Sequence, residues 1–136
     1  MRILIKNIVA LAGVLIMLST VRINKKTDEW KAPPEADKVS NPLKGNAAAT
    51  DAGKKLYAQL CVVCHGDKGK GDGVAGISLN PRPANHASQK VQSQTDGAIF
   101  WKITSGRPPM AAYNSTLTEV QRWQLVNYIR EIGKHK

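Results

Sequence analysis

The sequence predicts a small all-α domain preceded by an apolar N-terminal helix. Its 136 residues are enough for one core of ordinary size and no more. Apolar residues recur at helical spacing in three segments, and loops rich in glycine and proline separate these segments. No convincing run of alternating apolar and polar residues exceeds four residues, so strands are not expected. A multidomain enzyme and a large β/α barrel are therefore excluded.

Residues 1–23 have the layout of an export signal or a membrane anchor. Arg2 and Lys6 precede the unbroken apolar run of residues 8–18, and Arg22 follows it. As a helix, residues 3–21 would measure about 28 Å, close to the ~30 Å hydrocarbon layer of a membrane. No small-residue cleavage motif is well placed, so we expect an uncleaved anchor in preference to a cleaved signal peptide. Either way, the rest of the chain crosses to the outer face of a membrane.

Residues 24–46 are expected to form a linker. Pro33, Pro34 and Pro42 interrupt a stretch of mixed charge that has little apolar periodicity. Such a Pro-rich segment is semi-extended, and it would hold the folded domain, residues 47–136, away from the membrane surface.

The first helix of the domain is expected to begin at Thr50 or Asp51, because Asp51 suits a helix N-terminus. It should end near residues 64–66. Residues 66–76 then contain five glycines. A segment of that composition does not sustain a regular element, so it is expected to be a loop.

Two more helices are expected in the second half of the chain. A short one begins near Thr95 and ends at Gly106. The last begins at residues 118–121, whose sequence Thr-Glu-Val-Gln fits a capping box. We expect it to end with Gly133 as its C-terminal cap and to carry Val120 on its buried side.

The charge of the chain bears on its partners. Lys and Arg number 20 against 10 Asp and Glu, a net charge of +10. Residues 41–136 alone hold 13 basic and 6 acidic residues, a net charge of +7. A basic surface attracts nucleic acids, anionic lipids or acidic proteins. The lysines are scattered and no helix-turn-helix or zinc-finger pattern is present, so nucleic acid is not expected as a partner.

The chemistry centres on Cys61, Cys64 and His65, which form a Cys-x-x-Cys-His motif. This motif is the attachment signal of c-type haem, in which two thiols add to the haem vinyl groups and the histidine reaches the iron. Haem attachment occurs outside the cytoplasm, which agrees with the exported chain. A thioredoxin-like redox pair would need a βαβ context. A zinc site would need a second pair of ligands, of which only His86 is available. A disulfide over this helical spacing would be strained.

A haem iron held by His65 has one further axial position. Met110 is the only methionine outside the N-terminal segment, and Pro108 and Pro109 stiffen its loop. A thioether is a soft ligand that suits iron, so Met110 is the expected sixth ligand. The alternatives are that Met110 fills a gap in the core, or that His86 is the ligand. By default, however, His86 is a solvated surface residue.

Residues 48–133 resemble a class I cytochrome c of the bacterial single-haem type. The resemblance rests on four stretches of the sequence: Gly53-x-x-x-Tyr57-x-x-x-Cys61-x-x-Cys64-His65-Gly66 with Gly69-x-Gly71-Asp72-Gly73; Pro81-x-Pro83-Ala84; Asp96-Gly97-x-Ile99-Phe100-Trp101-x-Ile103-x-x-Gly106-x-Pro108-Pro109-Met110; and Leu117-Thr118, Trp123 and Val126-x-Tyr128-Ile129. It implies an all-α fold in which helices and loops wrap around one haem c, attached through Cys61 and Cys64. It also implies that the first and last helices cross near Gly53.

The resemblance implies further contacts to the haem. A backbone carbonyl near Pro81 or Pro83 is expected to accept the second imidazole N–H of His65, and the sequence does not choose between the two prolines. Trp101, Arg82 and Arg107 are candidates to bond the haem propionates, with core packing as the alternative for Trp101.

These inferences predict an electron carrier that is not itself an enzyme. A six-coordinate iron has no open position for a substrate and changes only its oxidation state. We expect respiratory-type redox partners with an acidic docking surface, met on the periplasmic side of the inner membrane. Two alternatives stay open. One is a haem enzyme or sensor with a labile distal position, for which only His86 offers an acid–base group. The other is a fixed subunit of a membrane complex.

Overall fold

The computed structural model describes residues 29–135. The expected N-terminal anchor lies outside these residues. Among the helices described, none is both long and apolar enough to cross a membrane. Within the described residues, residues 31–135 form one compact unit, which contains the expected haem motif.

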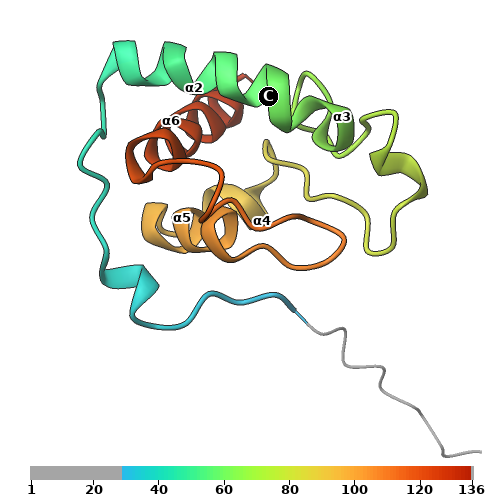
Figure 1. Cartoon of the computed structure of the whole chain (residues 1–136), viewed down its shortest axis with the longest axis horizontal. Coiled ribbons are helices and arrows are strands. Elements are labelled where there is room, and N and C mark those ends of the chain that lie inside the picture. Colours follow the sequence, from blue (N-terminus) through green and yellow to red (C-terminus); the bar gives the residue numbers. More distant parts are fainter. Residues whose placement is uncertain (1–28, 136) are drawn as a thin grey trace, which may run out of the picture. The chain divides into compact units, whose positions relative to one another are not determined.

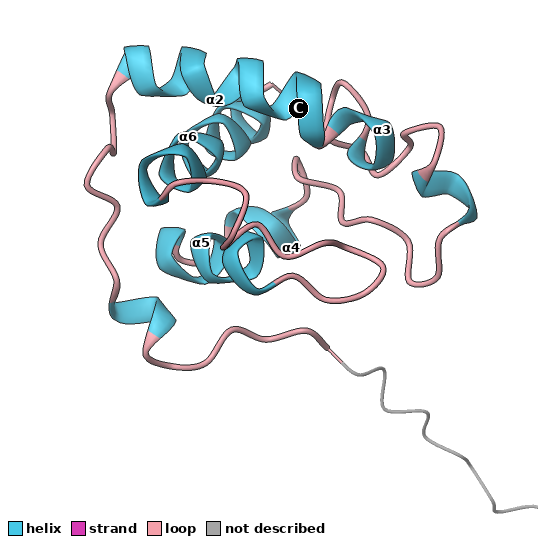
Figure 2. Ribbon diagram, in the orientation of Figure 1, coloured by secondary structure: helices cyan, strands magenta, loops and turns pink. Residues whose placement is uncertain are grey.

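The described part of the chain consists of helices and loops (Figure 2), as the sequence predicts. Its only β-type pairing is an isolated bridge between Arg107 and Met110. The elements, in chain order, are η1 (Ala36–Lys38), α2 (Ala47–Leu60), α3 (Val62–His65), η2 (Gly76–Ser78), α4 (Gln89–Gln92), α5 (Asp96–Ser105) and α6 (Glu119–Lys134).

The crossing of α2 and α6 is the main contact of the fold (Figure 1). Gly53 of α2 lies directly against the backbone carbonyl of Gln124, and a Cβ at Gly53 would also meet Cβ of Tyr128 at 3.2 Å. The two backbones therefore approach each other at a position that only glycine fits. The largest fully buried side chains are Tyr57 of α2 and Trp123, Leu125 and Val126 of α6.

The start of α2 differs from the expectation. The helix begins at Ala47, because the Asn46 side chain accepts a hydrogen bond from the Ala49 amide at 3.0 Å and caps the first turn. Thr50 lies inside the helix, and its hydroxyl donates back to the carbonyl of Asn46 at 3.0 Å. Thr50 and Asp51 resemble caps in the sequence, but the residue that caps is four or five positions earlier.

The capping predictions for the other two helices are confirmed. Thr95 caps the start of α5, Gly106 is the C-cap that follows its last residue Ser105, and Thr118 and Gln121 form the complete capping box of α6. The end of α6 was predicted wrongly. Gly133 lies within the helix, where a Cβ would collide with the Gln92 side chain. Val120 is half-exposed at 54%, because it lies in the first turn of α6, outside the buried face.

Residues 31–46, expected in a linker, pack onto the domain instead. Ala36 of η1 is buried, and its carbonyl lies where a Cβ of Gly97 would be. The side-chain amide of Asn41 donates to the carboxylate of Asp96 at 3.0 Å and to the side-chain oxygen of Asn127 at 2.9 Å. The side-chain amide of Asn127 in turn donates to the backbone carbonyl of Leu43 at 2.7 Å. These hydrogen bonds give the polar groups of Asn41 and Leu43 partners within the domain. Contacts of this kind leave no apolar periodicity in the sequence, so the pattern did not predict them.

Candidate haem-binding site

Cys61 is the single residue between α2 and α3, and Cys64 lies within α3. Cys61 ends α2, and its carbonyl accepts from the amides of Cys64 at 3.1 Å and His65 at 2.8 Å. The resulting single turn brings both thiols and the imidazole into one short segment. The thiols are free and half-buried. Burial, with a smaller contribution from Cys64, raises the pKa of the Cys61 thiol to about 12.

The Gly-rich segment after His65 folds back onto α3. The amides of Gly71, Gly73 and Ala75 donate to the carbonyls of His65, Cys64 and Val63 at 2.8, 3.2 and 2.9 Å. At Gly71, φ is +76° and a Cβ would collide with the carbonyl of Pro83. Glycine is therefore required where this loop meets its neighbours, and the loop fixes the attachment turn in place.

The His65 imidazole is buried, and its orientation suits an iron ligand. Its Nδ1 lies 3.1 Å from the carbonyl oxygen of Ala84. A carbonyl can only accept, so Nδ1 carries the proton and Nε2 keeps a lone pair for a metal. Burial lowers the pKa of His65, although the bond to Ala84 opposes this shift, and the ring is neutral at neutral pH. Two thiols beside a neutral imidazole with a free Nε2 fit a covalently attached haem.

The carbonyl that orients His65 belongs to Ala84. This residue directly follows Pro83, one of the two prolines near which the sequence places the acceptor. Pro81 is exposed, and no hydrogen bond joins its carbonyl to His65 among the bonds of the described residues. The expected acceptor near Pro81 or Pro83 is thus the residue that follows Pro83, and a role of Pro81 toward the haem stays a prediction.

His86 is buried, contrary to the expectation of a solvated surface residue. It is 8% exposed, and its ring stacks on that of His65 with centroids 4.1 Å apart and planes at 21°. Its Nδ1 lies 3.2 Å from the hydroxyl oxygen of Tyr57, and this hydroxyl donates its proton to the carbonyl of Gly66 at 3.3 Å. Burial, with a smaller effect of His65, lowers the pKa of His86 to about 3, so its ring is neutral at neutral pH.

This arrangement is incompatible with His86 as the sixth ligand. If both imidazoles were to bind one iron from opposite sides, their nitrogens would have to face each other with ring centroids roughly 6 Å apart. The rings of His65 and His86 instead lie face to face with centroids 4.1 Å apart. His86 therefore packs against the ring of His65 and is not placed to share a metal ion with it.

Met110 lies in a tight turn. Its amide donates to the carbonyl of Arg107 at 2.8 Å, and the Arg107 amide donates back at 3.1 Å, which forms the isolated bridge. Met110 is half-buried. Tyr113, three residues later, bonds to the carbonyl of Leu60 at 3.4 Å, directly before Cys61. The Met110 loop is thus joined to the helix end that carries the attachment cysteines.

The candidate propionate partners occupy different surroundings. Arg82 is exposed, and its guanidinium donates to the carbonyl of Ile77 at 3.4 Å. Trp101 is half-buried on α5, and Arg107 is half-buried in the turn of Met110. Their roles toward a haem stay predictions.

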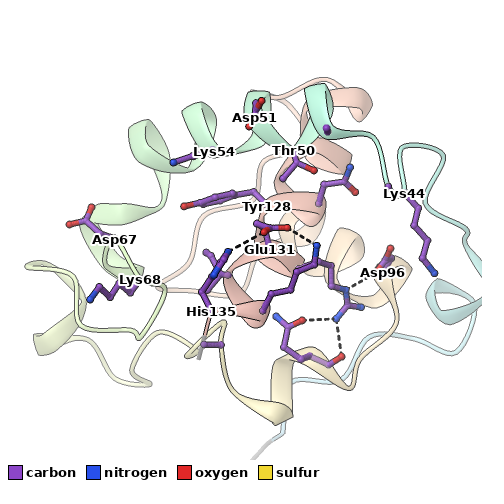
Figure 3. Close-up of a pocket in the computed structure, with 18 of the residues that line it drawn as sticks. Lys44, Thr50, Asp51, Lys54, Asp67, Lys68, Asp96, Tyr128, Glu131 and His135 are labelled. Atoms are coloured by element: carbon purple, nitrogen blue, oxygen red, sulfur yellow. Dashed lines mark hydrogen bonds and ion pairs between the residues drawn. The ribbon is translucent and has the colours of Figure 1, made fainter.

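A charged groove lies along α2 and α6 (Figure 3). It does not include the attachment residues. Within it, Glu131 accepts from Lys134 at 2.7 Å and lies 3.1 Å from His135, and Arg130 pairs with Asp96 at 2.7 Å. Charges of both signs line the groove, so it has no single sign of charge that would select an ion.

Comparison with known families decides what the motif belongs to. A family model described as cytochrome C oxidase, cbb3-type, subunit III matches residues 48–129. The chain belongs to this family of c-type cytochromes. The cytochrome therefore carries one haem c, covalently attached through Cys61 and Cys64, and its domain performs electron transfer.

Two solved structures agree with this assignment. One is the reducing HAO-like protein complex Kustc0457/Kustc0458 of Kuenenia stuttgartiensis, at 25% identity and a TM-score of 0.60 over 69% of this chain. The cytochrome spans 49% of the matched chain, about half of its length. The other is the c-type cytochrome KustC0563, at 29% identity and a TM-score of 0.51, with 59% of this chain and 95% of that one covered. A search of curated proteins finds no match.

Sequence reasoning gave the surroundings of the motif incompletely. Tyr57 entered only as part of the resemblance, Tyr113 was not considered, and His86 was expected at the surface by default, with ligation of the iron as its alternative. The spacing Tyr57-x-x-x-Cys61 places the tyrosine one helical turn before the attachment turn, so it could have indicated a nearby role. Nothing in the sequence indicates the stacking of His86 on His65.

Proposed function

We propose that this cytochrome is a one-electron carrier whose haem iron is ligated by His65 and Met110. It exchanges electrons with redox proteins on the periplasmic side of the inner membrane, to which the apolar N-terminal segment anchors it. One observation carries the ligation by His65: Nδ1 is bonded to Ala84, and Nε2 is left with a lone pair. When bound, the haem supplies a one-electron change in the oxidation state of its iron.

The protein side chains hold the ligands and exclude water. The Ala84 carbonyl fixes the tautomer of His65 and increases its basicity. The thioether of Met110 is a soft ligand, which raises the reduction potential above that of a bis-histidine site. The turn between Arg107 and Met110, together with the bond of Tyr113 to Leu60, restricts where the thioether can move. Such restraint keeps the ligand geometry similar in both oxidation states.

A docking surface for a redox partner lies around the attachment turn. The exposed apolar side chains Val63, Val74 and Ile77, named here the attachment face, are 50%, 81% and 54% exposed. The amide of Ala75 donates to the carbonyl of Val63, which holds this part of the loop to α3. Exposed Lys68, Lys70 and Arg82 lie in the same loop region, together with exposed Asp67 and Asp72. A small apolar patch with an excess of positive charge around it suits weak, salt-sensitive docking to an acidic partner.

A fixed subunit of a membrane complex is the second candidate. Its support is the description of the family as an oxidase subunit and the similarity to a chain from a protein complex. A haem enzyme or sensor has less support, because His86, the acid–base group that such a site would use, stacks on His65. Native gels of solubilised membranes distinguish a free carrier from a subunit.

A redox titration that records the absorption spectrum tests the proposal. Met110→Ala should lower the reduction potential and abolish the iron–sulfur charge-transfer band of the oxidised protein. Met110→His should restore a six-coordinate, low-spin spectrum at a potential below that of the wild type. In both variants the haem should stay attached.

Haem staining of a denaturing gel provides the control, with the Cys61→Ala/Cys64→Ala protein as the unstained reference. An oxidised Met110→Ala protein with the wild-type spectrum would show that the sulfur of Met110 does not bind the iron. A high-spin wild-type protein would favour the enzyme or sensor.

A further inference from the structure

The surroundings of the His65 ring leave it one orientation. The hydrogen bond to Ala84 lies at its Nδ1 edge, and the ring of His86 covers one face at 4.1 Å. Rotation of the His65 ring about its Cβ–Cγ bond would break the first contact and drive ring atoms into His86. One polar contact and one packing contact together define the plane of the imidazole.

His86 is itself held at several points. Its amide donates to the carbonyl of Gly69 at 2.6 Å, and its carbonyl accepts from the Gln92 side chain at 2.7 Å. Its Nδ1 bonds to the hydroxyl of Tyr57, and the rings of Tyr57 and His86 meet edge to face at 5.7 Å. Because both the backbone and the ring of His86 are restrained, the residue is a rigid support for its neighbour His65.

We propose that His86 is a positioning residue for the axial ligand His65. Its ring, fixed by Tyr57, sets the plane in which the His65 imidazole presents Nε2 to the iron. The proposal rests on the ligation of iron by His65 in the proposed function. The plane of an axial imidazole determines how its π orbitals overlap those of the iron, so it affects both the reduction potential and the g-values of the low-spin ferric state.

Two substitutions at His86 distinguish the effect of a planar ring from that of side-chain volume alone. His86→Phe keeps a planar ring, whereas His86→Leu keeps apolar volume without one. We expect the Leu protein to show shifted or broadened g-values in low-temperature electron paramagnetic resonance and a shifted reduction potential. The Phe protein should lie closer to the wild type in both. Tyr57→Phe removes one hydroxyl and should shift both readouts less than His86→Leu does.

Asn127→Ala is the matched control for loss of stability. Asn127 is also buried, and its side chain accepts a hydrogen bond from Asn41 and donates one to the carbonyl of Leu43. The Asn127→Ala protein should have a lower unfolding midpoint than the wild type but the same g-values and reduction potential. Haem staining should confirm full attachment in every protein compared.

Three results would overturn the proposal. In the first, His86→Leu has the g-values and potential of the wild type, so His86 only fills space. In the second, Asn127→Ala shifts both readouts as much as His86→Leu does, so the effect is one of general stability. In the third, His65→Ala keeps the wild-type low-spin spectrum, so His65 is not the ligand. This third result also refutes the proposed ligation, whereas the first two leave it intact.

Discussion

His65 depends on one carbonyl for its tautomer and on one neighbouring ring for its plane. Neither Ala84 nor His86 has a side chain that the haem motif requires, and both lie in the loop that follows the Gly-rich segment. The chemistry of the three motif residues could be predicted from their spacing. Their support could not, because contacts between residues 19 or 21 positions apart follow from the path of a loop.

The histidines of the domain should differ sharply in what they contribute. His65→Ala should lose the low-spin spectrum and lower the unfolding midpoint by more than loss of one ordinary hydrogen bond, worth about 1 kcal/mol, would explain. The reason is that a ligand to the iron stabilises only the folded chain. Absorption spectra recorded during denaturant unfolding measure both effects.

His135→Ala is the comparison, because this side chain is 75% exposed and contacts Glu131 on the surface. It should keep the spectrum and change stability by less than about 0.5 kcal/mol. Equal loss of stability in the two variants would argue against His65 as a ligand.

At the scale of elements, the sequence predicted helices better than helix ends. The capping residues of α5 and α6 were identified because each side chain acts on its own first turn. The C-terminal end of α6 was not identified, because Gly133 packs against Gln92 of α4. The sequence pattern did not predict α4. Tertiary packing decides such positions, and the local sequence does not record it.

The crossing of α2 and α6 gives a test at this scale. Gly53→Ala should destabilise the cytochrome by about 1–3 kcal/mol, because the new methyl group would meet the backbone of Gln124 and neither helix can move freely. Helix propensity acts in the opposite direction, since Ala is favoured over Gly by about 0.5–1 kcal/mol within a helix. Denaturant midpoints of the haem-loaded protein measure the balance.

Ala58→Gly provides the propensity control, because Ala58 is exposed on the same helix. It should cost about 1 kcal/mol through propensity alone. A Gly53→Ala protein more stable than the wild type would mean that the close approach of the two helices is not required.

At the scale of the whole molecule, the net charge of +10 is spread over the chain, but the attachment face should feel only the charges near it. Lys68→Glu/Lys70→Glu should slow electron exchange with ferrocyanide, an anionic reagent, by several-fold at low salt. The difference from the wild type should shrink as salt is added. Stopped-flow rates at several ionic strengths provide the measurement.

Lys38→Glu/Lys44→Glu changes the net charge by the same amount on exposed residues that lie in the segment before α2. This variant should slow electron exchange with ferrocyanide clearly less than Lys68→Glu/Lys70→Glu does. Equal effects of the two double variants would indicate that net charge acts without a local docking surface.

The packing of residues 31–46 also has a mechanical consequence. The Thr95 hydroxyl caps α5 and donates to Asp37 at 2.7 Å, so η1 is tied to the first turn of that helix. Any strain transmitted along the polypeptide from residues before 31 reaches α5 and the Asn41–Asn127 contact first. The turn that bears Cys61 and Cys64 lies further along the chain and is braced by its own glycine loop. Force on the chain from its N-terminal side should therefore leave the attachment turn, and with it the reduction potential, unchanged.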